Sequence, residues 1–319
     1  MPLNLDSLDQ SDARLVQAGL KHFGFYDGTM LGRPGPKTRA AYERYRGEPE
    51  DTAPVQSAEM LTYPRSVRDE MEFPGAIAEG TRGRKARRVQ EWLTIHGFRT
   101  AIDDDFGPAT KRALEAFQQA RGLSSTGTVD EETWKVLVAP MARAFAKAEP
   151  GSTFGDTVLR VARQHLKEHP IELGGANCGP WVRAYMDGNQ GEPWAWCAGF
   201  VTFVMKQAAE IHGVAKPLKG SFSCDLLATQ AKDEGRFVSG HEIGTTTAEW
   251  SEGNLGTCCV FLVRRTSSDW THTGFAFDYR ADGTFASIEG NTNDEGNREG
   301  YEVCRRVRGR GSMDFIRLV

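Results

Sequence analysis

Hydrophobic residues recur at helical spacing in two similar stretches of the N-terminal half. Residues 13–45 read ARLVQAGLKHFGFYDGTMLGRPGPKTRAAYERY, and residues 86–117 read ARRVQEWLTIHGFRTAIDDDFGPATKRALEAF. In each stretch an apolar helix pattern ends at Gly-Phe, and Gly-Pro-x-Thr then begins a second helix, because proline suits a first helical turn. Several matches in one order indicate an internal repeat. The matching positions are Val16, Gln17, Leu20, Gly24 and Phe25 with Val89, Gln90, Leu93, Gly97 and Phe98, followed by Gly35, Pro36, Thr38 and Ala41 with Gly107, Pro108, Thr110 and Ala113.

Each copy predicts a small all-α bundle of three helices. In the second copy, a turn at 127–130 precedes a third helix through Thr133, Trp134 and Leu137, whereas the first copy has only a weak counterpart at 55–61. We therefore predict bundles at 8–64 and 83–140. The segment 65–82, rich in Pro, Gly and charge, predicts a linker, and 141–154 predicts a second, partly helical linker.

The pattern changes near residue 155. An amphipathic helix is predicted at 156–168 and an almost entirely apolar, buried helix at 195–211. Short strands then follow one another to the end of the chain. Helices followed by antiparallel strands indicate an α+β domain over residues 155–319. The predicted strands are 258–264, 273–279, 284–290, 302–308 and 313–318.

Composition and charge narrow the class of protein. The chain has 319 residues, of which 39% are hydrophobic and 26% charged, and its formal net charge is −4. These values are typical of globular domains and give no support to nucleic-acid binding. No apolar run suits a transmembrane helix, and the first residues lack a secretory signal. We expect a monomer, made in a cytoplasm, with no membrane insertion.

The segment around Cys197 is the main candidate for chemistry. Cys197 follows Trp194-Ala195-Trp196 and stands where the buried helix begins. A helix N-terminus carries partial positive charge and free N–H groups, both of which favour the thiolate, the reactive form of cysteine. The Cys197 N–H is also placed to help hold an oxyanion. The structural alternative is a small buried side chain, as most free cysteines are.

A thiol nucleophile needs a base. His272 begins an apolar strand, and Asp282-Gly283 predicts a tight turn before the strand that ends near Glu289 and Asn291. Any even-length loop places His272 on the same face as these two residues. A two-residue loop sets His272 opposite Asn293, and a four-residue loop sets it opposite Asn291. A solvated strand-end histidine and a surface carboxylate are the alternatives. The histidines of this domain that we considered are His169, His212, His241 and His272.

The six cysteines all lie in the last 142 residues. A chain of this size without a secretory signal needs no disulfide framework. No CxxC pair or compact Cys/His group is present, so we expect no structural zinc site.

The second repeat resembles the three-helix type of peptidoglycan-binding domain over most of 83–140. The resemblance implies attachment to the bacterial cell wall. The first copy departs from the pattern, because Gly32-Arg33-Pro34 replaces its Asp-Asp-Phe stretch. The alternative is that these residues only specify a small helical fold. The matching residues are Val89-Gln90, Leu93, Gly97-Phe98, the run 105–108, Thr110, Ala113, Phe117-Gln118, Gly127, Val129-Asp130, Thr133 and Leu137.

Residues 155–319 resemble the CHAP family of cysteine- and histidine-dependent amidohydrolases and peptidases. The resemblance implies a papain-like α+β fold. It places the nucleophile on Cys197, the base on His272, the orienting carboxylate on Glu289 and a further polar partner on Asn291. Some relatives bind calcium before the cysteine, but the stretch 187–192 here has only two carboxylates, so we expect no cofactor. The segments that carry the resemblance are GGANCGPWV at 174–182, WCAGFV at 196–201, DWTHTG at 269–274, IEGNTN at 288–293 and EGYEVC at 299–304.

Together the two resemblances imply a modular peptidoglycan hydrolase that cuts an amide in the peptide part of the cell wall. The missing signal points to a bacteriophage endolysin, held in the host cytoplasm until lysis and then acting in the periplasm or wall. The alternatives are a bacterial remodelling enzyme or secreted antibacterial effector of the same chemistry, a cysteine protease acting on proteins, and an adhesive wall protein with an inactive catalytic fold.

Overall fold

The computed structural model divides the chain into two units, residues 1–56 and 57–319. In the first unit, helix α2 spans Pro36–Gly47 and begins at the predicted Gly-Pro-x-Thr sequence. The side-chain amide of Gln17 donates to the Thr38 hydroxyl at 3.0 Å and accepts from the Gly32 N–H at 2.9 Å. The third helix predicted at 55–61 lies outside the described residues. The described residues are 5, 13, 17, 26, 28, 31–47, 64–243, 250–293 and 300–318.

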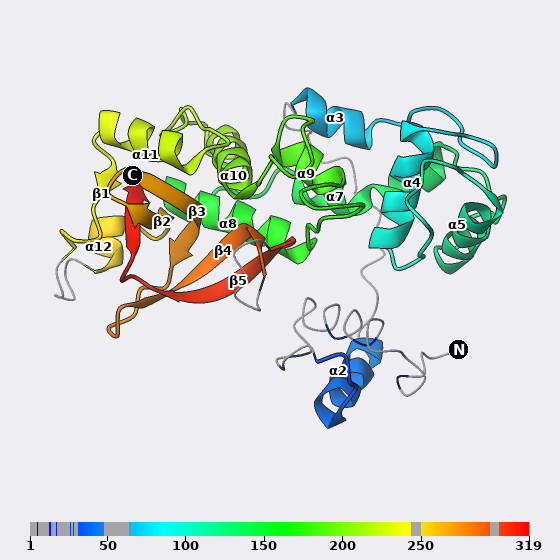
Figure 1. Ribbon diagram of the computed structural model, residues 1–319, viewed down its shortest axis with the longest axis horizontal. Coiled ribbons are helices and arrows are strands. Elements are labelled where there is room, and N and C mark those ends of the chain that lie inside the picture. The colour runs from blue at the N-terminus through cyan, green and yellow to red at the C-terminus, as the bar shows by residue number, and fades with distance from the viewer. Residues whose placement is uncertain are drawn as a thin grey trace. The chain divides into compact units, whose positions relative to one another are not determined.

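In the second unit, the second repeat forms helices α4 (Arg84–Ile95), α5 (Pro108–Ala120) and α6 (Glu131–Leu137), as predicted (Figure 1). Asp130 caps α6 by accepting the Thr133 N–H at 2.8 Å. The apolar positions of the three helices and their turns form a core. Its fully buried members include Val89, Trp92, Leu93, Phe106, Leu114, Phe117, Val129 and Leu137.

A buried glutamine links consecutive elements in both repeats. Gln90 donates to the Thr110 hydroxyl at 3.3 Å and accepts the Asp103 N–H at 3.1 Å, as Gln17 does with Thr38 and Gly32. A buried amide must satisfy its hydrogen-bonding groups, and here one side chain closes the loop between two helices. The matched Gln and Thr positions in the sequence therefore make the same contact in both copies.

The segment predicted as a linker at 65–82 is instead folded against the second bundle. Helix α3 spans Arg65–Met71. Val67 is fully buried, and the Trp134 indole donates to the Met71 carbonyl at 2.8 Å. The linker prediction failed because the charge of this segment is not solvated: the Glu70 side chain is completely buried in ion pairs. Helix α7 (Ala139–Ala144) begins just before the second predicted linker and extends into it, in keeping with the partly helical character predicted for 141–154.

The C-terminal part is α+β, as predicted, with a six-stranded antiparallel sheet in the order β1-β6-β2-β3-β4-β5. The five predicted strands are present as β2–β6, whereas α9, α11, α12 and the short β1 were not expected. The helices are α8 (Phe154–Lys167), α9 (Pro180–Tyr185), α10 (Cys197–His212), α11 (Cys224–Asp233) and α12 (Glu252–Leu255). The strands are β1 (Phe237–Val238), β2 (Cys259–Thr266), β3 (Asp269–Phe277), β4 (Thr284–Thr292), β5 (Glu302–Gly309) and β6 (Met313–Arg317).

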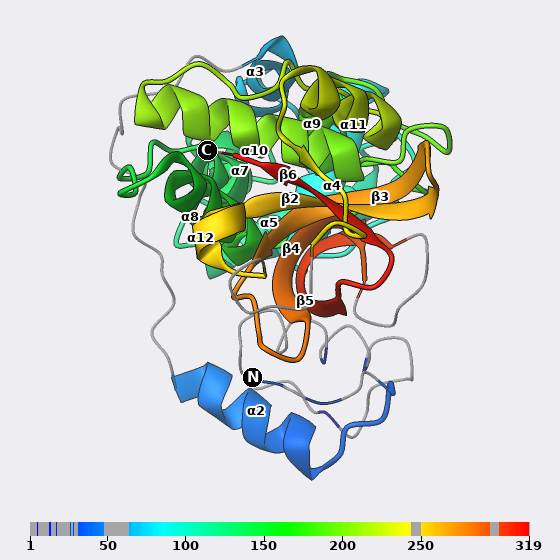
Figure 2. The same cartoon turned by 90° about the vertical axis from the view of Figure 1, so that its left-hand side faces the viewer.

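Much of the sheet is buried on both faces, whereas β5 is partly exposed. Helices α8 and α10 cover one face (Figure 2). On that face the Phe200 and Phe275 rings meet at 6.0 Å between centroids. The other face forms a smaller core in which Trp250 packs on Phe285 and Phe315. Burial on both faces explains why the first half of β2 reads as a continuous apolar run.

The second bundle and the α+β part share one apolar core. Trp92 of α4 meets Trp181 of α9 at 6.2 Å between ring centroids, and Phe145 packs on Trp181 as well. Figure 1 shows α7 and α9 between the α4–α5 bundle and the sheet with its helices. The two predicted domains therefore form one packed body, although the sequence suggested a linker between them.

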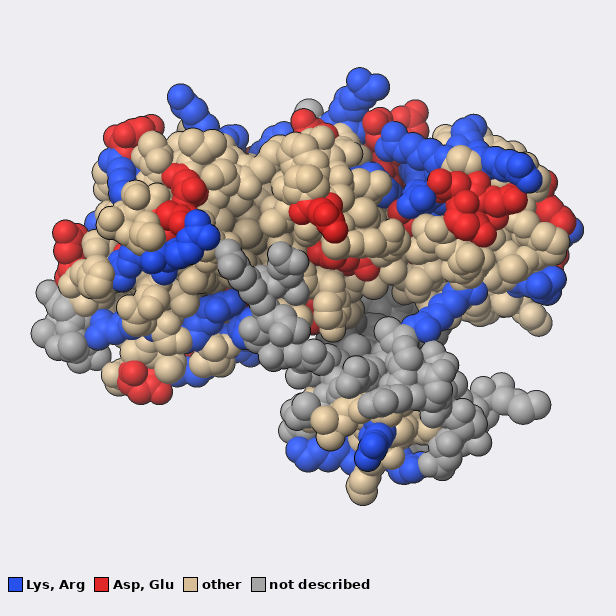
Figure 3. Space-filling view, in the orientation of Figure 1, with Lys and Arg blue, Asp and Glu red and all other residues tan. Residues whose placement is uncertain are grey.

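The surface of this body shows no separation of charge on the face drawn in Figure 3, where basic and acidic side chains are interspersed. Among the described residues, no helix is long and apolar enough to span a bilayer.

Candidate active site

Cys197 is the first residue of α10 and is 5% exposed. The helix start is set tightly against α9, because a Cβ at Gly199 would lie 2.9 Å from the Tyr185 carbonyl oxygen. Only glycine fits at this position. The irregular segment before the helix is also fixed: the Trp196 indole donates to Glu172 at 2.8 Å, and the Asn177 N–H donates to the other oxygen of that carboxylate at 2.8 Å.

His272 interacts with Cys197, because each side chain shifts the pKa of the other in favour of the charged pair. The His272 Nε2 is 2.9 Å from an oxygen of Glu289, so Nδ1 is the ring nitrogen that this carboxylate does not engage. The imidazole is 13% exposed, so His272, like Cys197, is mostly buried. The structure thus brings together Cys197, His272 and Glu289 from α10, β3 and β4 (Figure 1).

The hairpin register selects between the two loop lengths considered from the sequence. Phe275 pairs with Ile288, Ala276 with Ser287, and Phe277 with Ala286. This is the four-residue alternative, whose extension sets His272 opposite Asn291 and Gly274 opposite Glu289. A Cβ at Gly274 would lie 2.8 Å from the Glu289 Cγ, so glycine here makes room for the carboxylate beside His272.

Glu289 is completely buried and ionised. Both of its oxygens accept hydrogen bonds from Arg308 at 2.5 Å, and one also accepts from the Ser287 hydroxyl. Burial alone would raise the pKa of this carboxyl, but Arg308 and His272 overcome it and lower the pKa to about 2. A charged Glu289 then holds the imidazole in one orientation.

Arg308 was not found from the sequence. It stands on β5 opposite Phe285, which puts it on the face that carries Glu289. The alternation Cys304, Arg306, Arg308 along β5 could have signalled it, but only once the pairing of β4 with β5 was known.

Asn291, the fourth predicted site residue, is 6% exposed and has a left-handed backbone with φ of 53°. Its Oδ1 is buried and has no hydrogen-bond partner among the described residues. Glu289 is therefore the residue that contacts the His272 ring, and Asn291 offers an acceptor that the described part of the chain leaves unused.

A second cysteine belongs to the site and was also missed. The sulfur of Cys224, the first residue of α11, lies 3.9 Å from the sulfur of Cys197. A hydrogen bond from Cys224 lowers the pKa of Cys197 most, burial opposes this, and the bond and charge of His272 lower it further.

Burial opposes protonation of His272, but Cys197 and Glu289 raise its pKa to about 9. The pair is therefore a thiolate and an imidazolium.

The ion pair predicts the pH dependence of any reaction that starts from it. The pKa of His272 is raised from 6.5, so the imidazolium persists through neutral pH and is lost as the pH rises through about 9. The pKa of Cys197 is lowered, so the thiolate is lost only in acid. We expect kcat/KM on a peptidoglycan fragment to be level around neutrality and to fall above about pH 9. Full activity well above pH 9, where the imidazolium is lost, would contradict the pair.

Glu289→Gln should move the alkaline fall of that profile to lower pH by at least about one unit, because the imidazolium loses its anionic partner and Arg308 is left beside it. Glu302→Gln is the matched control. Glu302 pairs with His169 at 2.5 Å elsewhere in the sheet, so its removal should leave the alkaline limb in place. An unchanged limb in Glu289→Gln would show that Glu289 does not set the charge of His272.

The other histidines of the C-terminal part either contact residues other than Cys197 or are exposed. Glu302 holds His169, and Thr157 contacts His212 at 2.8 Å. His165 is completely buried between Tyr185 and Gln207, and burial lowers its pKa to about 4. His241 lies on an exposed turn.

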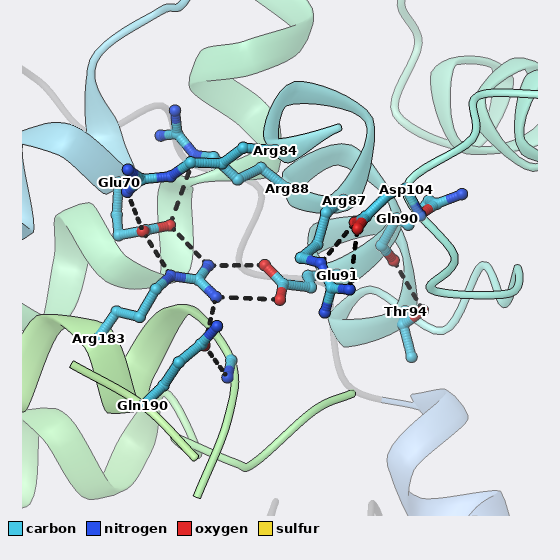
Figure 4. Close-up of polar contacts among 11 residues, drawn as sticks. Glu70, Arg84, Arg87, Arg88, Gln90, Glu91, Thr94, Asp104, Arg183 and Gln190 are labelled. Atoms are coloured by element: carbon cyan, nitrogen blue, oxygen red, sulfur yellow. Dashed lines mark hydrogen bonds and ion pairs between the residues drawn. The ribbon is translucent and has the colours of Figure 1, made fainter. Parts of the chain in front are cut away.

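A buried ion cluster joins the second bundle to the segment that leads into the site (Figure 4). Arg183 of α9 donates to Glu70 at 2.7 and 3.0 Å and to Glu91 at 3.1 and 2.6 Å. Arg183 also donates to the Gln190 side chain at 2.9 Å, a few residues before Cys197. Burial opposes the charge of Glu70, yet Arg183 and Arg88 hold its pKa below the usual value. The cluster links α3, α4 and α9, far apart in sequence.

Within the described ranges, no group of three His, Cys, Asp or Glu side chains is placed to hold a metal ion. Asp187 and Glu192, the two carboxylates of the stretch considered for calcium, are both exposed. Six cysteines are free thiols.

Comparison with known proteins identifies part of the chain. Residues 82–137 match the family model described as "Putative peptidoglycan binding domain". The chain contains a peptidoglycan-binding domain. The match begins just before α4 and ends with α6, which confirms the prediction for the second repeat. Its pattern residues Val89, Leu93, Phe117 and Leu137 are all fully buried, so they define the fold of the domain rather than touch a ligand.

A "Zinc D-Ala-D-Ala carboxypeptidase" of Streptomyces albus G is 38% identical over 68 residues, which are 20% of this chain and 27% of that protein. The chain therefore spans little more than a quarter of that relative. The described residues do not offer the donor set that zinc would need. No solved structure matches the chain.

Proposed function

We propose that the chain is a peptidoglycan hydrolase of the CHAP type that cleaves an amide in the peptide part of the bacterial cell wall. The observation that carries the proposal is the buried Cys197 thiolate paired with the His272 imidazolium, in a chain that also contains a peptidoglycan-binding domain. The relative named for D-Ala-D-Ala carboxypeptidase activity supports the substrate class.

In the proposed reaction, the Cys197 sulfur attacks the carbonyl carbon of the scissile amide. The thiolate needs no base at this step, because His272 already holds its proton. The tetrahedral oxyanion is held by the Cys197 N–H at the start of α10, where the helix N-terminus is positive.

His272 then donates its proton to the leaving amine, and the sulfur keeps the acyl group. The neutral imidazole next takes a proton from water, which attacks the thioester and releases the acid. Glu289 keeps the ring aimed at the sulfur throughout, and Arg308 holds Glu289. Asn291 is a further polar group of this end of the sheet, and its buried Oδ1 has no hydrogen-bond partner among the described residues.

The peptidoglycan-binding domain would hold the chain on its insoluble substrate and so raise the effective concentration of scissile amides near Cys197. Because it is packed on the catalytic part through the Arg183 cluster, it holds the wall at a fixed place relative to the body that carries Cys197. The first repeat, with its equivalent Gln17–Thr38 contact, is proposed as a second wall-binding module. We further propose an endolysin role, with release from a host cytoplasm to the wall.

The test is digestion of purified sacculi followed by mass spectrometry of the soluble fragments. The proposal expects fragments with new amine and carboxyl ends at one amide of the peptide stem or cross-bridge, and it expects intact glycan strands. Fragments cut within the glycan, or no soluble fragments at all, would overturn it. Digestion of casein at a similar rate would favour a protease acting on proteins.

A further inference from the structure

Two thiols from different helices meet beside His272. Cys197 begins α10 and Cys224 begins α11, with the sulfurs 3.9 Å apart and the two residues 5% and 7% exposed. The attack on an amide uses only one of them. Amide cleavage therefore does not explain why a second thiol lies at this position.

The position of Cys224 is fixed from both sides of the site. Thr202 of α10 donates to the Ser221 carbonyl at 2.7 Å and accepts the Ser221 N–H at 2.9 Å, which ties the loop before α11 to the nucleophile helix. Asp225 accepts the Trp270 N–H of β3 at 2.7 Å, two residues before His272. Cys224 is thus held against the same two elements that carry the thiol–imidazole pair.

We propose that Cys197 and Cys224 form a reversible redox pair, in which a peroxide converts the two thiols to a disulfide and a thiol reductant restores them. The disulfide leaves no sulfur nucleophile, so amide cleavage stops. Only this consequence for cleavage rests on the function proposed above; formation of the bond does not.

The chemistry balances in two steps. The Cys197 thiolate attacks one oxygen of the peroxide and the O–O bond breaks, which leaves a Cys197 sulfenic acid. The departing oxygen takes a proton from solvent and leaves as an alcohol or, from hydrogen peroxide, as water. Cys224 then attacks the sulfenic sulfur, the S–S bond forms, and hydroxide leaves and takes the Cys224 proton as water. The two sulfurs lose two electrons in total, and the peroxide gains them.

The change of charge at Cys197 favours the second step. While Cys197 is a thiolate, its bond with Cys224 and its charge keep Cys224 protonated. Oxidation removes that negative charge and with it the largest cause of the raised pKa of Cys224, although burial and Asp225 continue to raise it.

The geometry allows the bond. A disulfide needs sulfurs about 2.05 Å apart, so the 3.9 Å separation must close by roughly 1.9 Å. Rotation about χ1 of a side chain in a first helical turn can supply such a movement. Cys258 and Cys259 are poor competitors for the oxidant, because burial raises the pKa of both thiols.

The test treats the full chain with hydrogen peroxide, blocks remaining thiols with iodoacetamide and maps the peptides by mass spectrometry. The expected result is a cross-link between the peptides of Cys197 and Cys224 that disappears with dithiothreitol. A wild-type protein in which Cys197 ends as sulfinic or sulfonic acid while Cys224 stays a free thiol would overturn the proposal. No peptidoglycan is used, so this outcome is independent of whether the chain cuts the wall.

Variants supply a second measurement, each normalised to its own untreated activity on sacculi. Peroxide should inactivate the wild type reversibly, with most activity recovered by dithiothreitol. Cys224→Ala, or Cys224→Ser if the alanine variant does not fold, should lose activity irreversibly, since nothing intercepts the sulfenic acid. Cys178→Ala, which removes a partly exposed thiol of another loop, should behave as the wild type. Equal recovery in the Cys224 and Cys178 variants would contradict the pair.

Discussion

Cys197→Ala is expected to abolish the release of soluble fragments from sacculi, with a fall in rate on the order of 10⁴-fold or more, the scale seen when a nucleophile that acts as part of a unit is removed. The sulfur forms the bond to the carbonyl carbon in the proposed reaction. The neighbouring Cys224 thiol should not replace it, because burial still raises the pKa of Cys224 when Cys197 is gone. Turbidity loss and fragment yield measure the effect.

Two controls make that result specific. Cys178→Ala removes the same group from a loop and should retain wild-type activity. Cys197→Ala itself should still sediment with sacculi, because the peptidoglycan-binding domain at 82–137 is untouched. Residual cleavage by Cys197→Ala near the wild-type rate would place the catalytic centre elsewhere. Loss of sedimentation together with cleavage would indicate a folding defect instead.

Arg183→Met should lower the free energy of unfolding by about 3–5 kcal/mol, the cost of breaking a buried ion pair. Methionine keeps the apolar stem of the side chain but leaves Glu91 without its bidentate partner and Glu70 with only longer contacts to Arg84 and Arg88. For a body of this size the melting temperature should fall by roughly 6 °C or more. Thermal unfolding followed by circular dichroism measures it.

The matched control is Arg82→Met. Arg82 pairs with Asp105 at 3.3 Å, but the two side chains are 79% and 47% exposed, so this pair should be worth less than about 1 kcal/mol. Adding Glu70→Gln and Glu91→Gln to Arg183→Met should recover part of the loss, since the stranded charges are then gone. Equal melting temperatures for Arg183→Met and Arg82→Met would show that the cluster does not hold the two parts together.

The features that could be predicted from the sequence are those set by local residue patterns and by strand-pairing rules. The repeated Gln and Thr positions anticipated a contact found in both copies, and strand parity placed His272 and Glu289 on one face. Parity left the loop length open, and the structure selected the four-residue option. The helix start at Cys197 was recognised because an apolar helix and an aromatic, irregular segment meet there.

The residues that escaped prediction depend on contacts between distant segments. Arg308 is 19 positions from Glu289, Cys224 is 27 from Cys197, and Arg183 is 113 from Glu70. No local period reports such contacts. The same limit explains the wrong linker prediction at 65–82. Charged residues and proline are also typical of a solvated segment, and only the contact with Arg183 shows that Glu70 is buried.

The central claim, a Cys197 thiolate held by His272, is tested most directly by the pH dependence of alkylation at that residue. The protein is treated with limiting iodoacetamide from acid to pH 9, and the modified fraction of Cys197 is read from its peptide. The account predicts rapid modification of Cys197 already at mildly acidic pH, and a shift of this reactivity to higher pH in His272→Ala. Modification of Cys197 that rises only around pH 8.5, as for an ordinary free cysteine, would contradict it.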